Sequence, residues 1–209
     1  MDIHFAGADE DRAESAAFLG NAMIAALFLM FIILLTQFNS FYQAAITLST
    51  VVLSTVGALT GLLIVGQYFS VIMSGLGVVA LAGIIVNNSI VMIDTYNRLK
   101  DESSDQIKVI IHASSQRLRP ILLTTATTMI ALIPVALQIT INWFGRDIEI
   151  GGLMAAWWVP FSTTVIWGLG FSSILTLFLV PTLLAVPVYL KRNRNRWTRN
   201  IRRRIQPAE

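Results

Sequence analysis

The chain has 209 residues, of which 55% are hydrophobic and only 13% charged, and its mean hydropathy is +0.69. Soluble domains carry about 25% charged residues, whereas no Asp, Glu, Lys or Arg occurs anywhere in residues 15–93. These values exclude a soluble enzyme. The absence of cysteine and the presence of only two histidines exclude disulfides, thiolate metal sites and histidine-rich metal sites, so we expect neither a metal nor a cofactor.

Five apolar stretches are long enough to cross about 30 Å of hydrocarbon. Polar or glycine-containing turn signals separate them. The expected spans are about 17–35, 44–65, 71–93, 120–139 and 158–189. The fourth is expected to begin at Pro120, which suits a first helical turn, and to kink at Pro134. The predicted fold class is therefore an all-α membrane protein with five transmembrane helices.

A sixth, shorter helix is expected between the third and fourth spans. Residues 103–118 place apolar side chains at helical spacing, which predicts an interfacial helix lying flat on the membrane. Around the spanning domain, 17–190, the sequence predicts an acidic stub over 1–16 and a basic tail over 191–209.

The distribution of basic residues predicts the orientation. All but two of the 15 Lys and Arg residues, Arg12 and Arg146, lie in segment 94–119 or after residue 190. The positive-inside rule makes those two segments cytoplasmic and the N-terminus external. Because positive charge is concentrated in a tail, nucleic acid is not an expected partner. The acidic start lacks the basic region of a signal peptide, so we expect the sequence to continue a longer polypeptide.

Polar side chains inside the spans are the candidate functional residues. Asn87 and Asn88 lie in the third span and Thr124 in the fourth, and an unpaired amide in hydrocarbon costs several kcal/mol. Two interpretations stay open: hydrogen bonds that join helices, or a relay for protons or ions. Asp94, at the end of the third span, is expected to anchor the helix at the interface, with proton carriage as the alternative.

Glycines mark places where helices can approach closely. Gly57 and Gly61 form a G-x-x-x-G pair in the second span, and Gly83 lies in the third. We expect these three to be packing positions, and the alternative is a surface on which helices slide. A belt of tryptophans, Trp143, Trp157 and Trp158, is expected at the outer boundary of the membrane.

Several stretches resemble the C-terminal membrane half of the resistance-nodulation-division (RND) efflux permeases of the acriflavin-resistance type. The most specific are GIIVNNSIVMID at 83–94 and RLRPILLTT at 117–125, and the similarity extends to FLG at 18–20, QFNSF at 37–41 and FLVPTL at 178–183. The resemblance implies an inner-membrane fragment of a proton-driven multidrug or amphiphile antiporter, not an enzyme. It also implies the N-terminal half of the same permease, a homotrimer, a periplasmic adaptor, an outer-membrane channel and membrane lipid as partners.

The resemblance assigns roles beside the proton relay to Asn87, Asn88, Thr124 and Arg117. Asn87 matches a position that often carries lysine in the family, and this is the departure in the present sequence. An amide cannot neutralise a carboxylate as an ammonium does, so hydrogen bonding is the role expected of Asn87. The carboxylates that carry protons belong to the other half of these permeases.

Two other function classes remain. A structural or accessory membrane protein without transport activity of its own is the alternative to a permease fragment. A membrane enzyme would need His, Asp or Glu side chains converging at one interface, and only Asp94 and His112 lie near one edge of the predicted spans.

Overall fold

A computed structural model of the chain describes residues 7–100, 105–142 and 146–205. Its elements are, in chain order, α1 (Ala8–Phe38), α2 (Phe41–Val65), α3 (Val71–Leu99), α4 (Gln106–Ala136), β1 (Ile139–Asn142), β2 (Asp147–Ile150) and α5 (Leu153–Ile205). Within the described residues, five helices are long and apolar enough to cross a membrane, which confirms the predicted fold class.

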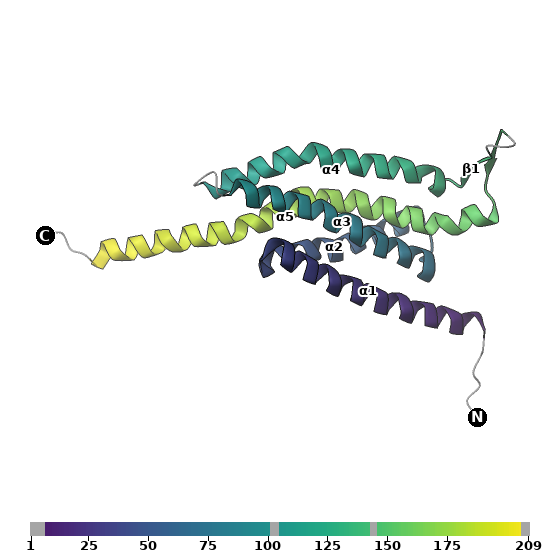
Figure 1. The fold of residues 1–209 in the computed structure, drawn as a ribbon, viewed down its shortest axis with the longest axis horizontal. Helices are drawn as coiled ribbons and strands as arrows, with labels where there is room; N and C mark the ends of the chain where they lie inside the picture. The colour runs from purple at the N-terminus through teal and green to yellow at the C-terminus, as the bar shows by residue number, and fades with distance from the viewer. Residues whose placement is uncertain (1–6, 101–104, 143–145, 206–209) are drawn as a thin grey trace, which may run out of the picture.

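The helices run back and forth along one direction, and the two chain termini lie at opposite ends of the bundle (Figure 1). We call the end at which α1 joins α2 and α3 joins α4 the polar end. The opposite end, where the two short strands lie, we call the hairpin end. An odd number of crossings accounts for the separation of the termini.

Short turns with defined caps connect the first three helices. Asn39 ends α1 in the left-handed conformation and donates its backbone N–H to the carbonyl of Leu35, while the Ser40 hydroxyl accepts from the backbone N–H of Gln43 at the start of α2. Gly66 ends α2 with φ +72°, which glycine adopts without strain. The turn signals in the sequence thus act as helix caps.

The centre of the bundle is formed by α2, α3 and α5. Ala58, Leu81, Ile85 and Leu169 are buried there in one hydrophobic cluster. By contrast, α1 lies at the edge, where Leu34 and Phe38 bury one end of the helix and most other side chains are at least partly exposed. α5 extends beyond the bundle at the polar end (Figure 1), because its 53 residues span about 80 Å at 1.5 Å per residue.

The structure differs from the expected interfacial helix. Residues 106–118 are the first part of α4, which continues through Pro120 as one arched helix (Figure 1). Proline removes one backbone donor, but membrane helices tolerate this where other groups satisfy the freed carbonyl. Along this part of α4, Val109, Ile110 and Ala113 are buried, and Ile111 and Leu118 are exposed.

The segment between the last two helices contains a feature that the sequence did not indicate. α4 ends at Ala136 rather than near 139, and β1 and β2 pair as an antiparallel hairpin before α5 begins at Leu153. Four expectations lie partly outside the described residues: residues 1–6 of the N-terminal stub, 103–104 of the interfacial helix, Trp143 of the aromatic belt and 206–209 of the basic tail.

Candidate functional site

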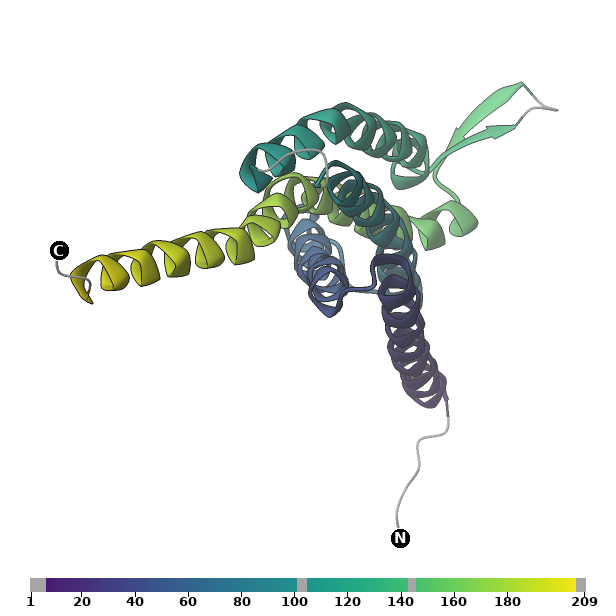
Figure 2. The same ribbon diagram turned by 60° about the vertical axis from the view of Figure 1, so that its left-hand side comes forward.

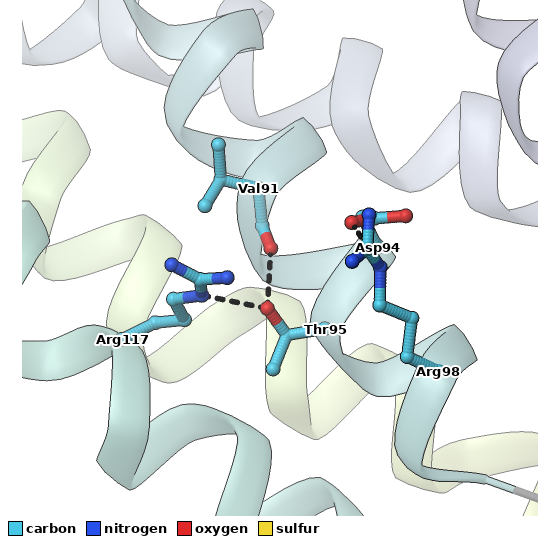
Figure 3. Close-up of polar contacts among 5 residues, drawn as sticks. All are labelled: Val91, Asp94, Thr95, Arg98 and Arg117. Atoms are coloured by element: carbon cyan, nitrogen blue, oxygen red, sulfur yellow. Dashed lines mark hydrogen bonds and ion pairs between the residues drawn. The ribbon is translucent and has the colours of Figure 1, made fainter.

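The crossing of α3 and α4 is held by an arginine. Arg117 of α4 donates from Nε to the hydroxyl of Thr95 on α3 at 2.6 Å, and that hydroxyl donates in turn to the carbonyl of Val91 at 2.8 Å (Figure 3). Thr95 is buried and Arg117 is half-buried. Because the hydroxyl both donates and accepts, its orientation is fixed, and it fixes the guanidinium in turn.

The guanidinium of Arg117 can donate further hydrogen bonds. Arginine has five N–H donors, and within residues 7–100, 105–142 and 146–205 the bond to Thr95 is the one hydrogen bond found for Arg117. Its terminal nitrogens therefore remain available to an anion or a carbonyl from outside this chain. A charged group held beside a membrane-spanning helix raises the local potential, and low dielectric strengthens the effect.

An ion pair lies nearby on α3. Arg98 Nε and Asp94 Oδ2 are 2.9 Å apart, one helical turn from each other (Figure 3). The Arg98 side chain is 79% exposed, so the pair sits at the surface of this chain. Within the described residues, no hydrogen bond or ion pair joins Asp94 to Arg117, and the anchoring role of Asp94 stays a prediction.

Asn87 and Thr124 are both exposed and are not joined by a hydrogen bond. Thr124 donates to its own helix, to the carbonyls of Pro120 and Ile121 at 3.1 Å. Asn88 is partly buried, and neither asparagine has a hydrogen-bond partner among the described residues. Within the described residues, neither asparagine side chain is therefore joined to Thr124 by a hydrogen bond.

Helical geometry nevertheless relates them to the crossing. Thr124 lies about two turns from Arg117 along α4, and Asn88 lies about two turns from Thr95 along α3, so each is close to the same helix side as the residue at the crossing. Asn87 is displaced further around α3, on the uncovered side. Of the four expected relay residues, Arg117, Asn88 and Thr124 thus lie near the helix sides that meet at the crossing, and Asn87 lies apart from them.

The buried hydroxyl pairs involve the residues next to those expected. Ser89 lies 3.3 Å from the hydroxyl of Thr50 on α2, and Thr125 lies 2.7 Å from that of Ser173 on α5. Both pairs are buried. Sequence reasoning missed them, although Ser89 shares the stripe of Ile85 and other apolar residues, and that position signals an inward side chain.

Further hydrogen bonds between helices lie at the polar end. The side-chain amides of Gln43 and Asn97 form a reciprocal pair between α2 and α3, with distances of 2.8 and 2.9 Å. Tyr42 donates to the carbonyl of Leu183 on α5 at 2.6 Å. These contacts join three helices at the end that holds the Arg117–Thr95 crossing.

The glycines behave differently from one another. A Cβ added at Gly57 would overlap Phe171 of α5, and one at Gly61 would overlap Trp167. We call these four residues the glycine contact. At Gly83, in contrast, an added Cβ would meet nothing within 4 Å, so in this chain Gly83 faces open space on the same side of α3 as Asn87.

The acidic and metal-ligating side chains form no candidate metal centre. Within the described residues, no three His, Cys, Asp or Glu side chains come together where a metal ion could be held.

Comparison with known proteins gives consistent matches. The sequence model of the AcrB/AcrD/AcrF family matches residues 1–187. The swarming motility protein SwrC of Bacillus subtilis is 34% identical over 186 residues, which cover 89% of this chain and 16% of SwrC. The multidrug resistance protein MdtC of Erwinia tasmaniensis is 31% identical over 176 residues, covering 84% of this chain and 16% of MdtC.

Solved structures give the same result. Two crystal forms of a heavy metal efflux pump superpose with TM-scores of 0.69 and 0.68 at 30% and 31% identity. Each match covers 85% of this chain and 16% of the pump. The chain therefore spans about a sixth of the length of these relatives.

Proposed function

Because the chain belongs to the AcrB/AcrD/AcrF family of RND permeases, we propose that it is the C-terminal transmembrane part of a proton-driven efflux transporter. Five membrane-spanning helices and the match over residues 1–187 support this proposal. The alternative, an accessory membrane protein without transport activity, is not favoured, since both curated relatives match with the same fraction of a much longer chain.

The observation that carries the proposal is the exposed polar surface of α3 and α4, which we call the α3–α4 boundary. Asn87, Gly83 and Thr124 are exposed on the outside of this chain, on helices otherwise long enough to span a membrane. Lipid is a poor neighbour for an unpaired amide. We therefore expect this boundary to pack against the remainder of the permease, with Asn87 and Asn88 hydrogen-bonding to it.

Proton coupling at such a boundary follows from electrostatics. A carboxylate in low dielectric has a raised pKa, and hydrogen bonds or positive charge near its ionised form lower that pKa again. In the proposed permease the carboxylates belong to the other half. Arg117, held by Thr95, supplies fixed positive charge at one mouth of the route, and the amides supply hydrogen bonds that rearrange with protonation.

The proposed orientation makes the polar end cytoplasmic and the hairpin end periplasmic, in a bacterial inner membrane. It rests on the gathering of Lys and Arg in segment 94–119 and after residue 190. A reporter fused after Glu209 of the full polypeptide is expected to be active only as a cytoplasmic fusion, and a periplasmic signal would contradict the five-span orientation. A matched fusion in the 143–145 segment is expected to give the reverse result.

Substrate and partners are proposed by class. We propose multidrug or amphiphile efflux by a homotrimer with a periplasmic adaptor and an outer-membrane channel. The relatives are named for swarming motility, multidrug resistance and heavy metal efflux. Susceptibility to a panel of dyes, detergents and metal salts, with and without the permease, is expected to change for the amphiphiles, and a change confined to metal salts would redirect the assignment.

The test of mechanism substitutes the residues along the boundary in the full permease. Arg117→Ala removes a charge-assisted hydrogen bond, which contributes about 1.5–3 kcal/mol, so efflux is expected to fall by roughly tenfold or more. Thr95→Val, which only frees the guanidinium, is expected to cost less, and Thr95→Ser to restore transport. Asn87→Leu is expected to reduce efflux at unchanged protein level and trimer assembly.

Arg98→Gln is the matched control, because it removes a positive charge from the neighbouring exposed ion pair. Efflux into everted vesicles, measured together with proton flux and normalised to permease content, separates transport from folding. Unchanged efflux in both Arg117→Ala and Asn87→Leu would remove the relay assignment and leave these residues as helix-joining groups, worth about 0.6 kcal/mol each.

A further inference from the structure

The hairpin between α4 and α5 is amphipathic. Its register pairs Ile139 with Ile150 and Ile141 with Ile148, and these pairs alternate with Thr140–Glu149 and Asn142–Asp147. Directly paired residues lie on the same face of an antiparallel ladder, and successive residues alternate between faces. Four isoleucine positions therefore occupy one face, and four polar or acidic positions occupy the other.

The hairpin turns sideways from the bundle. Figures 1 and 2 both show β1 and β2 projecting away from the direction of the helices, at the end where α4 finishes and α5 begins. Its base is closed by a hydrogen bond from the N–H of Gly151 to the carbonyl of Gln138 at 3.0 Å. Gly151 and Gly152 adopt φ values of +94° and +115°, which allow the sharp entry into α5.

The apolar side chains around the base of the hairpin are exposed. Ile150 is 79% exposed and Leu153 is 84% exposed. Leu137, Met154 and Trp157 are exposed beside them. The candidate membrane span in α5 begins at Leu153 itself, so this apolar surface continues directly into a helix that is long and apolar enough to cross a membrane.

A cavity of about 380 Å³ lies beneath the hairpin base, between the end of α4 and the start of α5. Its lining is mostly apolar, and includes Leu132, Ile139, Met154 and Trp158. An isolated two-stranded hairpin is at best marginally stable in water, and the exposed side chain of Ile150 adds to the cost of exposure. The hairpin therefore needs an apolar neighbour on one face and water on the other.

We propose that the hairpin lies in the lipid–water interface of the membrane, with its isoleucine face on the acyl chains and its acidic face in water. Three features support lipid as the neighbour. The hairpin projects sideways from the bundle, its apolar surface continues into the candidate span of α5, and its strand register separates apolar from polar positions. Exposed Arg146 and Glu149 lie where headgroups and water can solvate them. The interface thus holds the hairpin flat, and the aromatic ring of Trp157 lies in the same layer. This inference does not depend on transport.

Spin labels at adjacent residues test the placement. The 209 residues contain no cysteine, so single substitutions Ile150→Cys and Glu149→Cys can be labelled in the full polypeptide after any cysteine elsewhere is replaced by serine. In liposomes, collision rates are measured with oxygen, which concentrates in lipid, and with a neutral nickel chelate, which stays in water. Leu153→Cys provides a second apolar position should the label at Ile150 disturb folding.

The expected result is a severalfold higher ratio of oxygen to nickel collisions at Ile150 and Leu153 than at Glu149. Low accessibility to both reagents at Ile150 and Leu153 would show that another part of the permease or a second copy covers the face, and would overturn the proposal. High nickel accessibility at all three positions would place the hairpin in water and would overturn it equally. A permease that fails to transport but retains the lipid signature would contradict only the proposed function.

Discussion

The polar end and the glycine contact hold the helix bundle together by different means. At the polar end, directional hydrogen bonds such as Gln43–Asn97 and Arg117–Thr95 join specific atoms across helices. At the glycine contact, the missing side chains of Gly57 and Gly61 allow α5 aromatic rings to approach the α2 backbone. In lipid, where apolar surface gains little from burial against another helix, close packing and hydrogen bonding are the two available sources of association.

The two regions are expected to differ in how easily their helices move relative to one another. A directional bond between side chains loses its geometry when helices slide, whereas an aromatic ring over a glycine can rock without breaking a bond. The polar end is therefore expected to keep its arrangement, and the α2–α5 boundary is expected to take up small changes. The following substitutions break one region while sparing the other, in order of expected effect.

The largest effect is expected at the glycine contact. Gly61→Leu would force a side chain into the volume of Trp167, and overpacking of a filled site typically costs about 1–3 kcal/mol or more. The apparent melting temperature of the purified permease, followed by fluorescence-detected gel filtration, should drop by several degrees.

Gly170→Ala is the control for this prediction. A Cβ there would meet Met129 Cε at 3.6 Å, an ordinary contact with a flexible side chain. Trp167→Ala combined with Gly61→Leu should recover part of the loss. Equal melting temperatures for Gly61→Leu and Gly170→Ala would show that the α2–α5 approach is looser than the structure indicates.

An intermediate effect is expected at the amide pair. Gln43→Leu leaves the partly buried amide of Asn97 without its partner, and such side-chain hydrogen bonds in membrane proteins contribute about 0.6 kcal/mol on average and up to about 1.7. Asn97→Leu is expected to have the same effect, and the double variant should cost less than the sum. Melting temperatures of the four proteins form a double-mutant cycle, and strict additivity would show that the amides do not interact.

The smallest effect is expected at the exposed ion pair. Asp94→Asn breaks its contact with Arg98, and a surface pair one turn apart on a helix contributes about 0.3–0.5 kcal/mol. The shift should shrink as salt is raised, because exposed charges are screened. A large, salt-insensitive loss of stability would instead indicate that Asp94 is covered by another part of the permease.

The sequence by itself determined the architecture to a large extent. A chain uncharged over residues 15–93 has few options besides crossing the membrane, because backbone groups in hydrocarbon must be satisfied within a helix. Ser40 and Gly66 could be recognised as punctuation because capping chemistry is local. The motifs at 83–94 and 117–125 also pointed to the family that the comparisons show.

Tertiary structure decided which polar side chains meet. Asn87 and Thr124 were natural candidates from composition, yet the buried pairs use Ser89, two residues after Asn87, and Thr125, the residue after Thr124. Each residue turns the helix by about 100°, so one or two positions separate an inward side chain from an exposed one. The same applies to Gly83, which is chemically equivalent to Gly57 but faces open space. Only the placement of neighbouring helices distinguishes them.

The hairpin and the continuity of α4 were likewise decided by context. Apolar and polar residues alternate in β1 and β2, but each strand has only four residues, so this pattern is a weaker signal than the long apolar spans on either side. Pairing of the two strands also requires α4 and α5 to bring their ends together. Pro120 reads locally as a helix start. It lies inside α4 because the segments before and after it both pack on the same bundle. This packing offsets the one backbone hydrogen bond that proline removes, and the local sequence does not show it.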